Sequence, residues 1–74
     1  SDLVVNVAAL AELFPQGGEI TVADLVAKGA VRNGYPVKVL GDGEVSAAYT
    51  IKGVKASASA KSKIEAAGGS ISED

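Results

Sequence analysis

Apolar and polar residues alternate along the chain in short runs whose spacing changes from strand-like to helix-like. Residues 3–7 are mostly β-branched and apolar, which favours a strand, whereas residues 8–14 are helix formers. Leu10 and Phe14 recur at helical spacing, so they are expected on the buried face of that helix. Pro15 and the glycines that follow it predict the end of the helix.

A second helix is expected at residues 22–28. Thr21 and Asp24 form a variant of the capping box, in which Asp takes the usual Glu or Gln position. Gly29 suits the position just after the last turn, where helices often adopt a left-handed conformation. The pair Asn33-Gly34 then predicts a turn before the chain becomes extended again.

The second half of the chain repeats this alternation with shorter elements. Residues 37–40 and 49–54 have the composition of strands, and Gly53 interrupts the second of them. Ser57 is expected to be the N-cap of a third helix that extends through Ala67.

This third helix has one small apolar face and two basic flanks. Ala60 and Ile64 share the apolar face and are expected in the core, while Lys61 and Lys63 lie on either side of it. A last short strand is expected at residues 70–72.

Together these elements predict a small α/β domain of irregular strand-helix units, with three short helices and short mixed strands. No linker is long enough to divide the 74 residues, so residues 1–74 form a single domain. A domain of this size buries only about 60% of the surface of its unfolded chain, so its core is expected to be marginal. Apolar residues make up 47% of the chain and charged residues 22%, as is typical of globular proteins.

The residue types that are missing exclude most catalytic chemistry. The chain has no Cys, His, Met or Trp, which removes disulfides, the usual zinc and haem ligands, and Ser-His or Cys-His nucleophile pairs. Three aromatic residues are too few to wall a desolvated cleft. We therefore expect no catalytic residues, no metal, no cofactor and no small-molecule substrate. No apolar run approaches a membrane span, so no membrane contact is expected, and the lack of Cys fits the cytoplasm.

One glycine-rich motif has an alternative interpretation. The turn Gly41-Asp42-Gly43 follows a predicted strand and resembles the start of a Gly-x-Gly-x-x-Gly phosphate loop. However, the third glycine is missing, and residues 49–51 favour a strand where the phosphate loop needs a helix. Asp42 and Glu44 also lack the run of oxygen ligands found in a calcium loop. A solvated turn, with glycines at positive φ, is the preferred interpretation.

Charge is distributed unevenly along the chain. Lys52, Lys55, Lys61 and Lys63 are the only charged residues between Glu44 and Glu65, so this segment carries +4. The other three basic and nine acidic residues give the rest of the chain −6. The four lysines either form a solvated face or bind a polyanion such as a nucleic-acid backbone. Because no aromatic residues are interleaved with them, such binding would recognise backbone and shape.

The order of residues is more specific than their charge. Three blocks follow one another: Lys38-Val39-Leu40-Gly41-Asp42-Gly43-Glu44-Val45, then Ile51-Lys52, then Ala56-Ser57, Ala60 and Ile64-Glu65-Ala66-Ala67-Gly68-Gly69. This combination resembles the C-terminal signature of the large-subunit ribosomal proteins of the bacterial L-fifteen family. Earlier segments look like the preceding part of that domain: Val5-Asn6-Val7, Leu10, and Val22 to Gly29 with Val31. The resemblance covers nearly the whole chain.

The resemblance implies a structural constituent of the large ribosomal subunit, without catalysis, in the bacterial cytoplasm. It implies binding to large-subunit ribosomal RNA and to neighbouring large-subunit ribosomal proteins, and a contribution to subunit assembly and translation. The matching positions most expected to meet RNA are Lys52, Lys55, Lys61 and Lys63, with Lys38 and Arg32 as weaker candidates.

The chain also departs from the family pattern. Ala56 and Ala58 stand where relatives often have a bulky apolar residue and a lysine, and Tyr49 replaces a smaller aliphatic residue. The family's basic, glycine-rich N-terminal half has no counterpart here, so the chain is expected to be a fragment or isolated domain. An alternative function stays open, namely a protein-protein adaptor domain that uses Leu3 to Glu19 and does not bind RNA.

Overall fold

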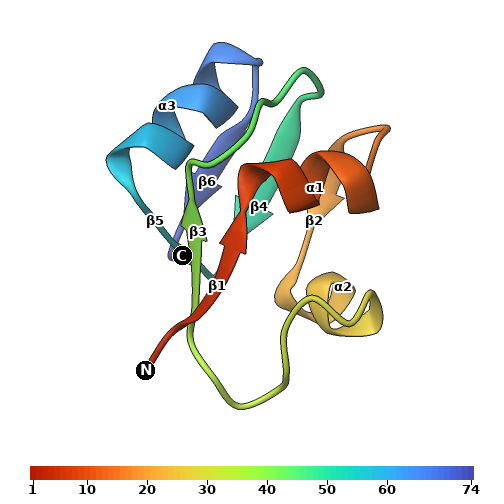
Figure 1. The fold of residues 1–74 in the computed structure, drawn as a ribbon, viewed down its shortest axis with the longest axis vertical. Coiled ribbons are helices and arrows are strands. Elements are labelled where there is room, and N and C mark those ends of the chain that lie inside the picture. The colour runs from red at the N-terminus through yellow and green to blue at the C-terminus, as the bar shows by residue number, and fades with distance from the viewer.

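Three consecutive units of the chain each contribute one strand to each of two parallel sheets (Figure 1). The computed structural model describes all residues from 1 to 74. In chain order the elements are β1 (Leu3–Asn6), α1 (Val7–Leu13), β2 (Gly18–Ile20), α2 (Val22–Ala27), β3 (Val37–Leu40), β4 (Tyr49–Lys52), β5 (Lys55–Ala56), α3 (Ala58–Ala66) and β6 (Ser70–Ser72). The expected α/β domain with three short helices is confirmed.

Odd-numbered and even-numbered strands lie in different sheets. The first sheet has the order β1-β3-β5 and the second the order β2-β4-β6, and every pairing is parallel. The chain crosses from the first sheet to the second three times, through α1, through residues 41–48 and through α3 (Figure 1). Because the strands are parallel, these three connections leave the same end of the first sheet and lie beside one another.

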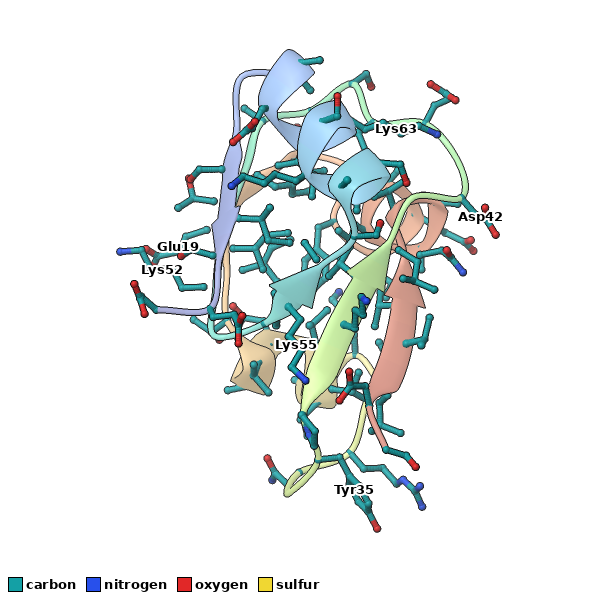
Figure 2. The ribbon with its side chains drawn as sticks, turned by 90° about the vertical axis from the view of Figure 1, so that its left-hand side faces the viewer. Glu19, Tyr35, Asp42, Lys52, Lys55 and Lys63 are labelled. Carbon is teal, nitrogen blue, oxygen red and sulfur yellow. The ribbon has the colours of Figure 1, made fainter.

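The core lies between the two sheets, where apolar side chains fill the space (Figure 2). Strand alternation supplies half of it, as Val37 and Val39 of β3 face inward while the residues between and after them face outward. The fourteen buried residues are all apolar: Val5, Val7, Leu10, Ile20, Leu25, Val31, Val37, Val39, Tyr49, Ile51, Val54, Ala60, Ile64 and Ile71. Phe14, which was expected in the core, is only partly buried. No helix is long and apolar enough to cross a membrane.

Local side-chain chemistry sets where the helices begin. The Thr21 N–H donates to Asp24 Oδ2 at 2.8 Å, and the Asp24 N–H donates to Thr21 Oγ1 at 3.1 Å, which confirms the capping box. The hydrogen bond from the Thr21 backbone lowers the pKa of Asp24 below its ordinary value. At the start of α3, Ser57 Oγ accepts from the Ala60 N–H at 3.2 Å, as its N-cap position predicts.

Two adjacent glycines follow α3 and have different roles. Gly68 has φ of +89°, and its N–H donates to the Glu65 carbonyl while the Gly69 N–H donates to the Ile64 carbonyl. Gly69 itself does not have a positive φ. Instead, a Cβ atom there would overlap the backbone of Tyr49 on β4. The second glycine therefore allows β6 to approach β4.

Tyr49 connects the second sheet to the end of α1. Its ring is buried, and its hydroxyl lies 3.1 Å from the Leu10 carbonyl oxygen and 2.6 Å from the Phe14 carbonyl oxygen. These carbonyls lie at the C-terminal end of α1, and each also accepts a backbone hydrogen bond, Leu10 from the Phe14 N–H and Phe14 from the Gly17 N–H. Burial raises the pKa of the Tyr49 phenol.

Two strands were not predicted from the sequence. Gly18 was interpreted as part of a helix stop and no strand was predicted at residues 18–20, but Ile20 is buried and β2 pairs with β4. The interruption expected at Gly53 is confirmed, because β4 ends at Lys52 and the chain turns at Gly53, where φ is +85°. The strand after this turn, β5, was not predicted and joins the first sheet beside β3. The bounds of the three helices lie within one residue of those expected.

Candidate nucleic-acid interface

Five different elements or loops carry the six basic residues predicted to meet RNA. Lys52 ends β4, Lys55 begins β5, Lys61 and Lys63 are on α3, Lys38 is on β3, and Arg32 is in the loop between α2 and β3. Figure 2 shows Lys63 near Asp42, Lys55 over the first sheet, and Lys52 on the other side of the molecule near Glu19. The structure therefore does not gather the lysines of residues 52–63 into one cluster.

Lys63 uses its ammonium group inside the protein. Its Nζ donates to the carbonyl oxygens of Gly41 and Gly43, at 2.7 and 2.6 Å, and lies 3.5 Å from Glu44 Oε2. Two of the three protons of the ammonium group are therefore donated within the chain, and the Glu44 carboxylate adds an ion pair. Because two of these partners are backbone carbonyls, Lys63 ties α3 to the loop that follows β3.

Sequence reasoning missed this role of Lys63. The signal that could have suggested it is the Gly41-Asp42-Gly43 turn, which leaves carbonyl oxygens without partners in a sheet. Gly43 has the positive φ expected of the turn, at +104°. Gly41 does not, and a side chain there would overlap Ser59 of α3. The turn is therefore shaped by its contact with α3 as well as by its backbone conformation.

Lys38 and Lys55 are neighbours on the outer face of the first sheet. They are directly paired in the register of β3 and β5, and Val4 of β1 is on the other side of Lys38 in the same row. Val4 is 51% exposed. Lys55 also lies 3.5 Å from Asp2, a surface ion pair of the kind that contributes at most about 1 kcal/mol. Lys38 and Lys55 thus share one face of the first sheet.

Lys52 and Lys61 lie beside the strand that ends the chain. Lys52 pairs with Ser72 in the register of β4 and β6. Lys61, Ser72 and Glu73 line a hollow of about 160 Å³. Glu19 extends from the neighbouring strand near Lys52 (Figure 2). Both lysines therefore have carboxylates in their surroundings, which weakens the local positive potential.

Arg32 lies in the middle of the loop between α2 and β3. Its Cζ atom is 5.0 Å from the centre of the Tyr35 ring, and both side chains are exposed. The predicted turn at Asn33-Gly34 is confirmed and separates the two residues, with φ of +89° at Gly34. The loop leads into β3, which carries Lys38. We call Arg32, Lys38 and Lys55 the basic face.

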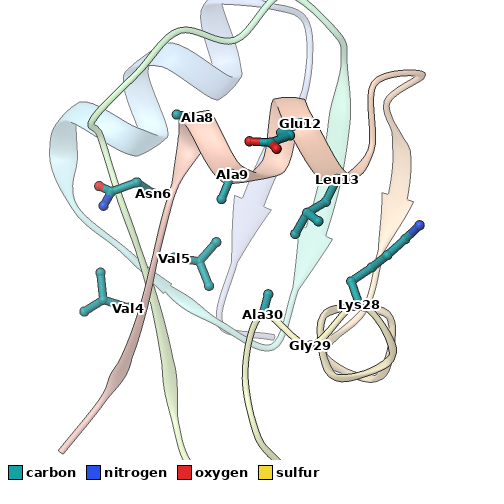
Figure 3. Close-up of a pocket in the computed structure, with 10 residues that line it drawn as sticks. All are labelled: Val4, Val5, Asn6, Ala8, Ala9, Glu12, Leu13, Lys28, Gly29 and Ala30. Carbon is teal, nitrogen blue, oxygen red and sulfur yellow. The ribbon is translucent and has the colours of Figure 1, made fainter.

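A larger hollow, of about 550 Å³, lies on the side of β1 and α1 (Figure 3). Its walls are mostly apolar, and its polar side chains are Asn6, Glu12 and Lys28. Asp24 and Tyr49, whose pKa values the fold displaces, do not line it. No group of acidic residues on the chain is arranged to hold a metal ion. The hollow resembles a groove for an apolar segment more than a reaction site.

Comparison with known proteins gives these residues a context. The family model described as ribosomal proteins 50S-L15, 50S-L18e and 60S-L27A matches residues 4–72. The large ribosomal subunit protein uL15 of Bifidobacterium adolescentis is 96% identical over 71 residues, which cover 96% of this chain and 48% of the relative. The protein of the same name from Bifidobacterium longum is 76% identical over 71 residues, covering 96% and 47%. That of Frankia casuarinae is 63% identical over 70 residues, covering 95% and 44%.

The chain spans about half the length of the relatives that it matches. These relatives are all named as proteins of the large ribosomal subunit. The matched region extends from β1 to the end of β6. The chain therefore belongs to the family of ribosomal proteins 50S-L15, 50S-L18e and 60S-L27A.

Proposed function

We propose that the chain is a structural domain of the large ribosomal subunit in the bacterial cytoplasm. In this role it binds large-subunit ribosomal RNA and neighbouring ribosomal proteins, and supports subunit assembly and translation. The observation that carries the proposal is the family match over residues 4–72, together with relatives named as large-subunit proteins. Because the chain spans about half of each relative, we propose that a basic, glycine-rich half of the parent protein supplies further RNA contacts.

Charge placement supports the basic face as the main RNA contact of this domain. Residues 25–41 contain Lys28, Arg32 and Lys38 but no acidic residue. The fold places Lys38 directly beside Lys55, so the two acid-free stretches of the sequence meet on the first sheet. Side by side, these ammonium groups suit adjacent phosphates of one backbone, and each neutralised phosphate releases counterions. Lys52 and Lys61 are proposed as further contacts, and Lys63 contributes by holding α3 in place.

The salt dependence of RNA binding tests this proposal. We expect the variant K38A/K55A to lower the slope of log affinity against log salt by about 0.7 to 0.9 for each phosphate that the variant no longer neutralises. The matched control is K52A/K61A, which removes the same charge from a different part of the surface. Binding to deproteinised large-subunit RNA of Bifidobacterium adolescentis is measured by filter retention over a series of salt concentrations.

The two double variants separate three results. If the slope of log affinity against log salt is smaller for K38A/K55A than for K52A/K61A, the result supports the basic face. If it is smaller for K52A/K61A, the main RNA contact lies near β6. Equal slopes in the original chain and both variants would contradict lysine-mediated RNA binding by this domain.

A protein-protein adaptor remains the second candidate, because the hollow of about 550 Å³ is lined by part of the segment from Leu3 to Glu19. Its apolar walls and the exposed Val4 suit an extended apolar segment of a partner. This candidate predicts that V4D abolishes binding to a partner protein and that the original chain does not bind large-subunit RNA. RNA binding that K38A/K55A weakens would count against it.

A further inference from the structure

Tyr35 is the aromatic side chain that the fold leaves open to solvent. It is 48% exposed, whereas Tyr49 is fully buried and Phe14 is partly buried. Figure 2 shows Tyr35 at the end of the molecule, away from the core. About half of its surface is open, and the Arg32 guanidinium lies over the ring, with Cζ 5.0 Å from its centre. Its exposed surface is therefore available to a partner.

The loop around Tyr35 is held at both ends. Val31 before it and Val37 after it are buried, with exposures of 6% and 2%. The Pro36 carbonyl oxygen accepts a hydrogen bond from the Leu3 N–H at 2.8 Å, which continues the pairing of β1 with β3. Between these anchors the turn at Gly34 brings Arg32 and Tyr35 together. The pair is thus positioned before any partner arrives, which reduces the entropy cost of binding.

The stacked arginine and its surroundings indicate the chemistry of that partner. The Arg32 guanidinium covers one face of the Tyr35 ring, with Cζ 5.0 Å from its centre, and leaves the rest of the ring accessible. No acidic residue occurs in residues 25–41, and Lys38 follows on the adjoining strand. The carboxylate of Asp2, which precedes Leu3 beside Pro36, is ion-paired with Lys55. An aromatic ring beside positive charges suits a partner that combines a flat π-system with a negative backbone, as an unpaired nucleotide does.

We propose that Tyr35, with Arg32 packed against one face, stacks on an unpaired base of RNA. The inference rests on the proposed RNA-binding function and adds to it a contact that phosphate neutralisation does not provide. Stacking tolerates any base, because every base has a π-face, whereas it requires that the base be outside a regular helix. The loop thereby favours a bulge or loop in RNA, while Lys38 and Lys55 hold the adjacent backbone.

The test compares Y35L with Y35F, since leucine keeps an apolar side chain but loses the ring, and phenylalanine keeps the ring. The probes are two synthetic RNA duplexes with equal numbers of phosphates, one fully paired and one with a bulge of unpaired adenines. Affinity is measured for the 74-residue chain at several salt concentrations. Tyrosine fluorescence provides a second readout, because the chain has no Trp and only two Tyr residues. Circular dichroism checks that each variant is folded.

We expect Y35L to bind the bulged duplex about five- to a hundredfold more weakly, without a change in salt slope, and Y35F to bind within about twofold of the original chain. The fully paired duplex should bind all three chains alike. Fluorescence of the original chain should be quenched by the bulged duplex, and quenching should be absent in Y35L.

Three results would overturn the inference. If Y35L binds the bulged duplex as well as Y35F does, while K38A/K55A still lowers the salt slope, backbone binding stands and stacking fails. Equal affinity of the original chain for both duplexes also excludes a base contact and would assign the exposed ring to a protein partner. If the chain binds neither duplex nor large-subunit RNA, the proposed function fails together with the inference.

Discussion

At the scale of single residues, the position of a charge in the sequence did not determine its role. Lys63 belongs to the lysine-rich segment predicted to face RNA, yet its ammonium group contacts two backbone carbonyls and Glu44. Those carbonyls belong to residues about twenty positions earlier, so no local pattern connects them with Lys63. The exposure of Tyr35 was equally hidden, because a single aromatic residue in a sequence is found more often in a core than on a surface.

The contacts of Lys63 predict a stability effect that its position on the surface would not suggest. Replacing it by methionine, K63M, keeps most of the aliphatic stem but leaves the carbonyls of Gly41 and Gly43 without a donor. We expect the free energy of unfolding to fall by about 1–2 kcal/mol, since each bond involves a charged donor and the side chain is partly exposed, at 35%.

Urea unfolding followed by circular dichroism measures this decrease. K61M is the matched control, as Lys61 is exposed on the same helix and no hydrogen bond or ion pair of its ammonium group is found. It should change stability by less than about 0.5 kcal/mol. Equal effects of K63M and K61M would show that the carbonyl contacts of Lys63 contribute no stability.

Tyr49 gives the domain a sensitivity to alkaline pH. Burial raises the pKa of its phenol above the usual 10.0, so the folded state retains the phenolic proton at pH values where the unfolded chain has released it. The stability associated with this proton is complete below pH 10 and decreases as pH rises through the folded-state pKa. In the variant Y35F, where Tyr49 is the remaining tyrosine, tyrosinate absorbance should therefore have a midpoint above pH 10. A midpoint at or below pH 10 in the folded protein would contradict the buried position of the ring.

At the scale of elements, local chemistry predicted the helices well and the strands incompletely. The Thr21–Asp24 capping box and the Ser57 N-cap are signals within a few residues, and the helices begin where these residues place them. β2 and β5 have three and two residues, too few for a periodic pattern. They form because Ile20 reaches the core and because the turn at Gly53 redirects the chain, and both effects depend on distant partners.

The junction between α3 and β6 provides a test at this scale. A side chain at Gly69 would overlap the backbone of Tyr49, whereas one at Gly29, after α2, would meet open space but adopt a positive φ of +75°. We expect G69A to destabilise the domain by about 1–3 kcal/mol through overpacking, and G29A by about 1–2 kcal/mol through backbone strain alone.

The two variants differ more clearly in structure than in energy. G69A should disturb the pairing of β4 with β6, and amide hydrogen exchange at Ile51 should then become faster than in the original chain. In G29A, amide exchange in the second sheet should become faster only by as much as the lower stability of the whole domain requires. Slow exchange at Ile51 in G69A would mean that the second glycine is not needed for strand approach.

At the scale of the whole molecule, the arrangement of parallel strands explains how a chain with a net charge of −2 can present a basic surface. Each unit returns the chain to the first sheet, so Lys38 and Lys55 become neighbours although they are far apart in the sequence. The sequence alone showed the lysines and the family pattern. The complete fold brings Lys38 and Lys55 together on one sheet and places Lys52 and Lys63 on other parts of the surface. Asp2, which forms an ion pair with Lys55, is an acidic residue beside the basic face.

The most direct test of the central claim is the chemical accessibility of individual lysines inside the ribosome. Acetylation rates of each lysine are measured by mass spectrometry in the free 74-residue chain and in large ribosomal subunits that contain it. We predict that Lys38 and Lys55 react in the free chain and become protected in the subunit, while Lys63 reacts slowly in both because its carbonyl contacts persist. Unchanged reactivity of Lys38 and Lys55 on assembly would contradict the assignment of the basic face to ribosomal RNA.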